Sequence, residues 1–285
     1  MIGVFGIVMA LIASMVWGAT PAIVTAYARE APSIPFNVVR VLASLPLLIA
    51  IEILRVGESS IVLSPLSVML FVSAALLGPG LGDVAYIRSI QLIGANRAVM
   101  ISYTYIFVAQ IIAATLIHER YTMWMLLGSL TAFSGIVLAF YRGEARLDPR
   151  GVVYGVVAAF SWGLGSVINK LALSFADPLT LACVRMLILL IVLSSVARRS
   201  VVVVIRERMW LLSSVITGVL AYGVGLPLFL YALNIVGISM TVLITALVPM
   251  FTALLSKIIA GEGMGIRVLL GLSMVSMGIA ISSMG

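Results

Sequence analysis

The segment Val184–Ala197 reads VRMLILLIVLSSVA and decides the class of the fold, because Arg185 is its single charged residue. Leu211–Tyr222 is a second long and continuous apolar run. A helix needs about 20 mostly apolar residues to cross the hydrocarbon of a membrane. A membrane-spanning β-strand instead reads as roughly ten residues of alternating polarity. These runs therefore predict membrane-spanning α-helices.

The composition extends this prediction to the whole chain. Of its 285 residues, 63% are hydrophobic and 9% are charged, and the mean hydropathy is +1.26. A soluble domain carries roughly a quarter charged residues. The expected surroundings are therefore a lipid bilayer, and we predict an all-α, multi-pass protein of the cell membrane. Although the net charge is +7, the sequence contains no basic patch interleaved with aromatic residues, so no nucleic-acid partner is expected.

Charges, Pro and Gly divide the apolar runs into ten predicted helices. The polar segment Arg142–Arg150 connects a first unit of five helices, residues 1–141, to a second, residues 151–285. A basic stretch, Arg198–Arg208, separates helices seven and eight. The predicted helices span residues 3–28, 34–54, 67–92, 95–116, 122–141, 151–174, 178–197, 209–235, 238–259 and 265–283.

The two units repeat one another. A shift of 145 residues places Trp17-Gly18 on Trp162-Gly163 and Arg40 on Arg185. In helix three the same shift places Gly78, Gly80, Leu81 and Tyr86 on Gly223, Gly225, Leu226 and Tyr231. After a two-residue contraction the shift becomes 143, and the matches are then Gly94 with Gly237, Glu119 with Glu262, Gly128 with Gly271, and Gly135-Ile136 with Gly278-Ile279.

The odd number of helices in each unit determines the relation between the units. A chain that crosses the membrane five times begins its second unit on the opposite side. The two units are therefore predicted to be inverted repeats, related by a pseudo-twofold axis in the membrane plane. Inverted repeats are typical of secondary transporters that work by alternating access. The expected partner is a small-molecule substrate.

The motifs resemble those of the drug/metabolite transporter superfamily, EamA family, over essentially the whole chain. The second unit carries the resemblance through Trp162-Gly163, Asn169-Lys170, Arg185, Pro249 and Gly261-Glu262. The first unit departs from the pattern, with His118-Glu119 where Gly-Glu is usual and Ile106 where Pro is usual. The resemblance implies two five-helix repeats and the export of amino acids, other metabolites or drugs.

Paired interruptions of helices three and eight indicate where a solute would bind. The segments are Gly78-Pro79-Gly80-Leu81-Gly82 and Gly223-Val224-Gly225-Leu226-Pro227. Broken helices in corresponding positions of two repeats are typical of a binding site at the membrane midplane. Close packing of neighbouring helices through small residues is the alternative interpretation.

Asp83 is the only acidic residue deep within an apolar run. A charge at that depth is costly, so it is expected to face the protein interior and to have a partner. Arg40 is the preferred partner, because Arg88 points to another side of the same helix. Asp83 would bind a substrate amine or accept a coupling proton, or the pair would be purely structural.

Arg185 approaches the membrane from the opposite side, and no deep acid lies at its level. Its long stem could carry the charge to the headgroups. Alternatively, an unpaired cation beside a cavity would favour an anionic or carboxylate-bearing solute.

Aromatic residues would complete the cavity, which we expect helices one, three, four, six and eight to line. The predicted substrate-binding residues are Trp17, Gly78, Pro79, Gly80, Asp83, Tyr86, Tyr103, Trp162, Arg185, Tyr222, Gly225, Pro227 and Tyr231.

Other functions find less support in the sequence. One His and one Cys cannot form a usual zinc site, and no phosphate-binding Gly-x-x-x-x-Gly-Lys-Ser/Thr motif is present. We therefore expect no enzyme activity, no metal and no cofactor.

A membrane channel is the alternative to a carrier, although rings of charge and a filter sequence are absent. The sequence leaves open proton coupling and the choice between a monomer and a homodimer.

The orientation prediction depends on basic residues. Eleven Lys and Arg residues lie in or beside the odd-numbered loops, against Arg55 and Arg120 in the even-numbered loops. The positive-inside rule places the odd loops in the cytoplasm and both termini outside. The family resemblance implies cytoplasmic termini instead, and we favour the charge count.

Overall fold

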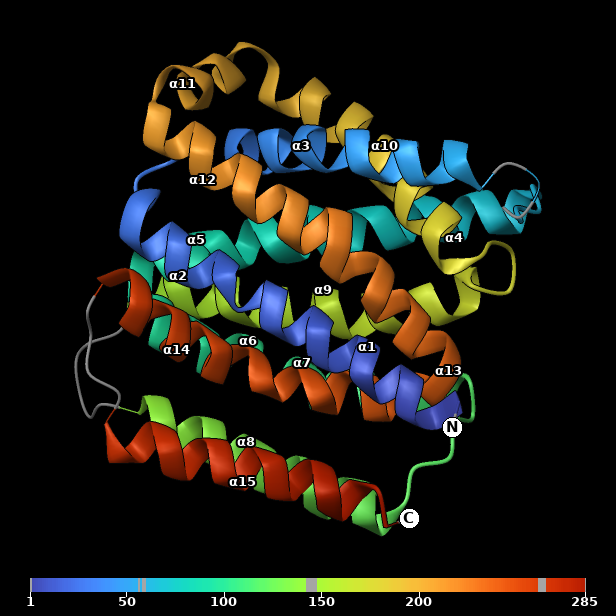
Figure 1. The fold of residues 1–285 in the computed structure, drawn as a ribbon, viewed down its shortest axis with the longest axis vertical. Helices are drawn as coiled ribbons and strands as arrows, with labels where there is room; N and C mark the ends of the chain where they lie inside the picture. The colour runs from blue at the N-terminus through green and yellow to red at the C-terminus, as the bar shows by residue number, and fades with distance from the viewer. Residues whose placement is uncertain (1, 56, 58–59, 142–147, 261–264, 285) are drawn as a thin grey trace.

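The computed structural model describes residues 2–55, 57, 60–141, 148–260 and 265–284. Within these ranges the chain forms ten roughly parallel or antiparallel helical segments, some of them interrupted (Figure 1). Eight stretches of the described residues are long and apolar enough to cross a membrane, and Ile266–Ser282 is a shorter apolar helix. The stretch Arg208–Ile259 contains two segments that meet at Gly237. The predicted all-α fold of ten helices is confirmed.

The first five segments occupy the predicted positions, with ends that differ by two residues or fewer. Segments one, three and four each consist of more than one helix. Their helices are α1 (Ile2–Trp17) and α2 (Ala19–Tyr27); α3 (Ser33–Leu54); α4 (Pro65–Ala75), the π-helical segment η1 (Leu76–Gly82) and α5 (Asp83–Ile93); α6 (Ala95–Ser102) and α7 (Tyr105–Leu116); and α8 (Met123–Phe140).

The second five segments follow the same plan. Their helices are α9 (Pro149–Ala172); α10 (Pro178–Ala197); α12 (Arg208–Gly218), the π-helical segment η3 (Val219–Gly225) and α13 (Leu226–Ile244), which contains the break at Gly237; η4 (Thr245–Leu247) and α14 (Val248–Ala260); and α15 (Ile266–Ser282).

The basic stretch between helices seven and eight is helical. A 3-10 turn, η2 (Arg198–Ser200), leads into the short helix α11 (Val201–Arg206). Val204 is fully buried and attaches this short helix to the bundle, while its apolar neighbours Val203 and Ile205 are exposed.

Polar residues fix the starts of several helices. Ser64, Thr122, Asp148 and Asp177 each accept a hydrogen bond from a backbone N–H in the first turn of the following helix. Such caps satisfy donors that have no partner within the helix. Pro follows the cap in three of these four cases, where its missing N–H costs nothing.

Charged side chains stabilise the break between segments eight and nine. Gly237 has a φ of 80°, a conformation that residues with a Cβ rarely adopt. The Glu119 carboxylate accepts hydrogen bonds from the N–H groups of Ile238 at 3.0 Å and Ser239 at 2.7 Å, on the far side of the break. Lys170 donates to the carbonyl of Leu233 before the break at 2.8 Å. Each charge therefore matches the dipole of the helix end it contacts.

Gly94 has a φ of 82° at the equivalent break in the first half. Glu262, the counterpart of Glu119, lies outside the described residues, as does most of the connecting segment 142–150. Gly94 and Gly237 thus place the two breaks in equivalent positions of the two halves.

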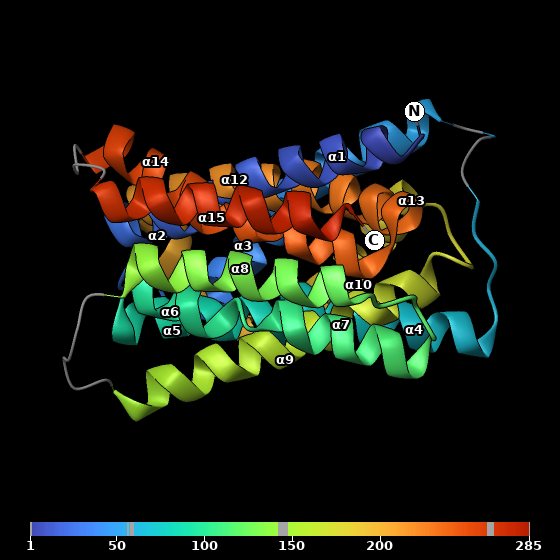
Figure 2. The same ribbon diagram turned by 90° about the horizontal axis from the view of Figure 1, so that it is seen from below.

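Contacts at one end of the molecule establish the inversion. The loop after segment two meets the loop after segment six, where Ile61 pairs with Ala176 in an isolated antiparallel bridge. Segment two ends on the side where the chain begins. Segment six ends on that same side only if the second half is inverted. Figure 2 accordingly shows both termini toward one end of the bundle.

A polar cluster holds these two loops together. Arg55 lies 3.1 Å from Asp177 and 3.4 Å from Glu52, and Asp177 also accepts a hydrogen bond from the Ser60 N–H at 3.0 Å. Burial raises the pKa of the Asp177 carboxyl, but hydrogen bonds from Thr180, Ser60 and Arg55 outweigh it and hold that pKa below its ordinary value.

Helices α8 and α15, equivalent in the two halves, pack against each other in antiparallel orientation along one side of the bundle (Figure 1). Their contacts are reciprocal. A Cβ added at Gly135 would lie 2.6 Å from the Gly271 carbonyl oxygen, and one added at Gly271 would lie 2.5 Å from that of Gly135. Gly128 and Gly278 are related in the same way. This is the symmetry that a pseudo-twofold axis between inverted repeats requires.

The π-helical segments correct the alignment of helices three and eight. Leu76–Gly82 and Val219–Gly225 are each seven residues long and are related by a shift of 143, not 145. Gly82 and Gly225 therefore correspond, and each lies against a Trp ring. A Cβ added at either glycine would lie 2.5 Å from an indole atom. The two-residue contraction thus precedes helix three rather than following it.

Substitution of Gly135 by Ala tests the α8–α15 contact. We expect a loss of about 1–3 kcal/mol in stability, as is typical of overpacking, because the added methyl group meets backbone atoms of α15. The measurement is thermal unfolding of the purified protein in detergent. Gly3→Ala is the matched control, since a Cβ added at Gly3 would have no atom within 4 Å. Equal stability of the two variants would show that the helices do not pack this closely.

Candidate functional site

A cavity of about 120 Å³ lies between the two halves. Segments one to four and six to nine all contribute to its wall, including both π-helical segments. The candidate residues of the sequence analysis that line it are Trp17, Arg40, Gly78, Pro79, Asp83, Tyr86, Tyr103, Trp162, Arg185 and Tyr222.

Four candidate residues do not line this cavity. Gly80 packs against α10, where a Cβ would lie 3.2 Å from Leu189, and Gly225 provides the space for Trp17. Pro227 is buried at the start of α13. Tyr231 lies one turn further along α13, toward the Glu52–Arg55–Asp177 cluster. The π-helical segments overlap both predicted interruptions, but the second begins at Val219 and ends at Gly225, before the predicted Pro227. Their glycines mostly contact neighbouring helices.

Sequence reasoning missed several wall residues. Thr20 and Asn169 line the cavity. Each lies on the same helical face as a tryptophan that the sequence analysis predicted to bind the substrate. Thr20 follows Trp17 by three residues, and Asn169 follows Trp162 by seven. Helical spacing from the two tryptophans was therefore the signal that could have identified them.

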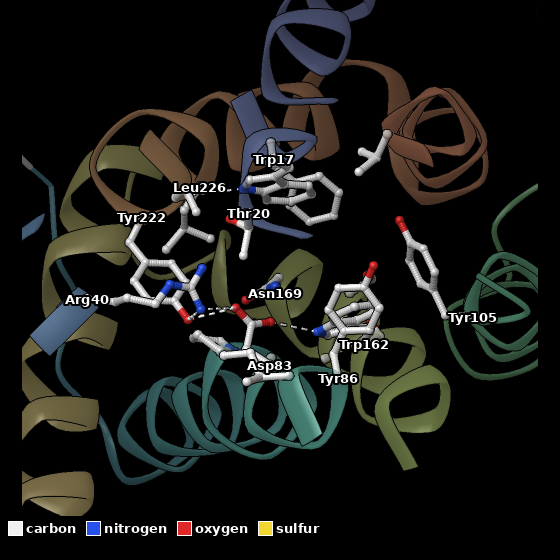
Figure 3. Close-up of a pocket in the computed structure, with 18 of the residues that line it drawn as sticks. Trp17, Thr20, Arg40, Asp83, Tyr86, Tyr105, Trp162, Asn169, Tyr222 and Leu226 are labelled. Atoms are coloured by element: carbon white, nitrogen blue, oxygen red, sulfur yellow. Dashed lines mark hydrogen bonds and ion pairs between the residues drawn. The ribbon is translucent and has the colours of Figure 1, made fainter. Parts of the chain in front are cut away.

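Asp83 is the centre of the polar side of the cavity (Figure 3). Its Oδ2 accepts hydrogen bonds from Arg40 Nη1 at 3.3 Å and from the Tyr222 hydroxyl at 2.6 Å. Its Oδ1 accepts a hydrogen bond from Trp162 Nε1 at 2.9 Å. Arg40 and Asp83 belong to the first half, whereas Tyr222 and Trp162 belong to the second. The carboxylate therefore joins the two halves.

Asn37 extends this network into the π-helical segment of the first half. Its carbonyl oxygen accepts a hydrogen bond from Arg40 at 3.0 Å. Its amide nitrogen donates to the Pro79 carbonyl at 2.6 Å, an oxygen in the interrupted segment η1. The Arg40 guanidinium also lies over the ring of Tyr222, 4.4 Å from the centroid, which adds a cation–π contact.

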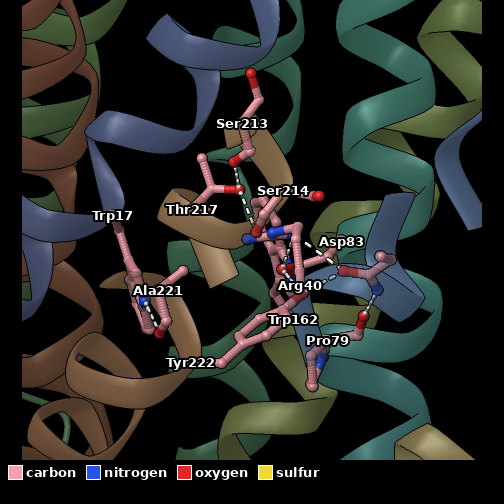
Figure 4. Close-up of polar contacts among 11 residues, drawn as sticks. Trp17, Arg40, Pro79, Asp83, Trp162, Ser213, Ser214, Thr217, Ala221 and Tyr222 are labelled. Carbon is pink, nitrogen blue, oxygen red and sulfur yellow. Dashed lines mark hydrogen bonds and ion pairs between the residues drawn. The ribbon is translucent and has the colours of Figure 1, made fainter. Parts of the chain in front are cut away.

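The two Trp-Gly motifs have equivalent structural roles. Gly18 allows α2 to approach Phe251 and Gly163 allows α9 to approach Val108, with an added Cβ at 2.6 Å in both cases. The Trp17 indole donates to the Ala221 carbonyl in η3 at 3.0 Å (Figure 4). Trp162 instead donates to Asp83. Each tryptophan therefore contacts the interrupted helix of the other half.

The aromatic walls are also related by the pseudo-twofold axis. Trp17 and Phe229 have ring centroids 5.0 Å apart, and Trp162 and Tyr86 have theirs 4.9 Å apart. The polar groups break this symmetry. The first half presents Asp83, Tyr86, Tyr103 and Tyr105, and the equivalent positions in the second half, at the shift of 143, hold Leu226, Phe229, Ala246 and Val248.

Polar atoms without partners gather around the cavity. Nine buried side-chain nitrogen and oxygen atoms lack a hydrogen-bond partner within the described part of the chain. Six of them belong to residues that line the cavity. Buried polar groups are normally paired, so such a concentration indicates a site that receives polar groups from elsewhere. The six atoms belong to Thr20, Arg40, Tyr86, Asn169 and, twice, Arg185.

Comparisons with known proteins agree with this architecture. A family model described as the EamA-like transporter family matches residues 4–141 and 149–284. An uncharacterized transporter of Archaeoglobus fulgidus is 22% identical over 213 residues, which is 75% of each chain. A solved structure described only as the crystal structure of a protein matches with a TM-score of 0.79 at 16% identity, over 98% of this chain and 96% of the other.

A double-mutant cycle tests whether Arg40 and Asp83 form one energetic unit. Removing one partner of a buried ion pair costs about 3–5 kcal/mol, so Arg40→Gln and Asp83→Asn should each lower the unfolding temperature in detergent. The double variant should lose less than the sum of the two, because no unpaired charge remains. Arg88→Gln, at an exposed position on α5, should have little effect. Strict additivity would contradict the pairing.

Proposed function

The chain belongs to the EamA-like transporter family, and on that premise we propose that it carries an amino acid or a similar small solute by alternating access. It is a multi-pass membrane transporter of small solutes. The proposed refinement is a secondary carrier whose solute occupies the cavity between the inverted halves. The proposed direction is export, in keeping with the metabolite and drug exporters that the chain resembles.

The observation that carries this proposal is a cavity located between two halves that pack reciprocally. Inverted repeats can exchange their conformations, and this exchange turns an inward-facing cavity into an outward-facing one. Glycines at the α8–α15 contact and at both Trp-Gly motifs have equivalent neighbours in the two halves. This equivalence supports two arrangements of similar energy, which alternating access requires.

The size and walls of the cavity support a small, partly apolar solute. A volume of about 120 Å³ is below the roughly 300–1,000 Å³ of pockets for drug-sized ligands. Trp17, Trp162 and Tyr86 supply aromatic surface, and Asp83 supplies an acid with a side chain that is 20% exposed. An amine of the solute would compete with Arg40 for this carboxylate.

Asp83 is proposed to couple solute binding to the movement of the halves. Its contacts with Tyr222 and Trp162 cross from one half to the other. An amine bound at Asp83, or a proton on it, would weaken these contacts because a neutralised carboxylate is a poorer acceptor. The two halves would then be free to separate at this network.

Counterflow in proteoliposomes tests the proposal. Vesicles containing the purified protein and preloaded with unlabelled L-leucine or L-phenylalanine should transiently accumulate the labelled amino acid from outside, with saturable rates. Flux that rises linearly with concentration and ignores the preloaded solute would identify a channel. Asp83→Asn should abolish counterflow, because the neutral amide cannot form an ion pair with the amine of the solute. Normal counterflow in a folded Asp83→Asn variant would contradict the coupling role.

A further inference from the structure

Arg185 is the second buried arginine at the cavity, and its guanidinium is mostly without partners. The residue is 1% exposed. Its Nη2 donates to the Ala74 carbonyl at 2.8 Å. Its Nε and Nη1 have no hydrogen-bond partner among the described residues. The charge therefore stays in the interior and does not extend to the headgroups.

The internal symmetry identifies what is missing at Arg185. Arg185 is equivalent to Arg40, whose guanidinium contacts an amide oxygen, a carboxylate and a hydroxyl. None of these groups has a counterpart at the position that the pseudo-twofold symmetry relates to it. At the equivalent positions the chain has Ala182 for Asn37, Leu226 for Asp83 and Pro79 for Tyr222.

No acidic side chain among the described residues forms an ion pair with Arg185. Asp83 is the one acidic residue among the described residues that line the cavity, and Arg40, Tyr222 and Trp162 already occupy it. Gly78 lies directly against Arg185, and a Cβ there would be 2.8 Å from Nη2. A buried cation without a counter-charge is strongly unfavourable. Its retention at the cavity wall calls for an anion that arrives from outside the chain.

We infer that Arg185 binds a carboxylate group of the transported solute. The guanidinium offers several N–H donors in a fixed plane, and carboxylates match this geometry well. The inference rests on the proposed function and specifies its substrate class: a solute that carries a carboxylate and is small enough for the cavity. The solute would supply at Arg185 the anionic group that Asp83 supplies at Arg40.

Pairs of compounds that differ only in the carboxylate test this assignment without a transport assay. The purified protein in detergent is titrated with L-leucine and L-leucinamide, and with isovalerate and isovaleramide, while thermal unfolding is followed. The carboxylates should stabilise the protein at concentrations at least about ten-fold lower than their amides do, as expected for a charge-assisted pair. Equal stabilisation by acid and amide would overturn the inference. Stabilisation by sodium sulfate as strong as that by the carboxylates would also overturn it.

Variants locate the effect at the residue. In Arg185→Gln the preference for the carboxylate should disappear, and Arg185→Lys should retain part of it because the charge remains. Arg88→Gln, at an exposed arginine on α5, should keep the full preference. A folded Arg185→Gln variant that still prefers carboxylates would place the anion elsewhere. Failure of counterflow with every solute would instead contradict the transport proposal, while the binding preference would still stand.

Discussion

A charge buried in the hydrocarbon core of a membrane must find its partner within the protein, since lipid supplies none. This constraint organises the interior of the molecule. Glu119 and Lys170 each contact the end of a broken helix, and Nη1 of Arg40 contacts Asp83, Asn37 and Tyr222. Among the described residues, Arg40 has an acidic partner in Asp83, whereas Arg185 has a backbone carbonyl as its partner and two nitrogen atoms without one. The position where the constraint is not met is therefore informative about the solute.

The pseudo-twofold symmetry makes this exception visible. Helix packing follows the symmetry closely, as the reciprocal glycine contacts of α8 with α15 and the two tryptophan pockets demonstrate. The polar lining of the cavity does not follow it. Close packing has been retained in both halves, which would allow them to exchange conformations, whereas the chemistry of the wall differs between them. The first half supplies the acid and the hydroxyl-bearing rings, and the second supplies a cation surrounded by apolar residues.

Much of this organisation could be predicted from the sequence, because long apolar runs and their interruptions report directly on helices in lipid. The predicted helix ends differ from the observed ones by two residues or fewer, and the structure contains the Asp83–Arg40 pair. The alignment of helices three and eight was wrong for a physical reason. Gly78, Gly80 and Gly82 are spaced by two, so shifts of 143 and 145 both place glycine on glycine. The bounds of the two π-helical segments and the contacts of Gly82 and Gly225 with the tryptophan rings distinguish them. Tyr222 as a partner of Asp83 was not foreseen, because its contact crosses between the halves.

The proposed alternating-access mechanism depends on the inverted relation of the halves, and cysteine accessibility in sealed, oriented vesicles measures that relation. Arg29 and Ser174 are equivalent exposed positions after the first helix of each half. Each is replaced singly by cysteine in a Cys183→Ser background, and a membrane-impermeant thiol reagent is applied from one side. Inverted halves require labelling from opposite sides, with Ser60→Cys labelled from the same side as Ser174→Cys. Labelling of Arg29→Cys and Ser174→Cys from one side would contradict the inversion and the mechanism built on it.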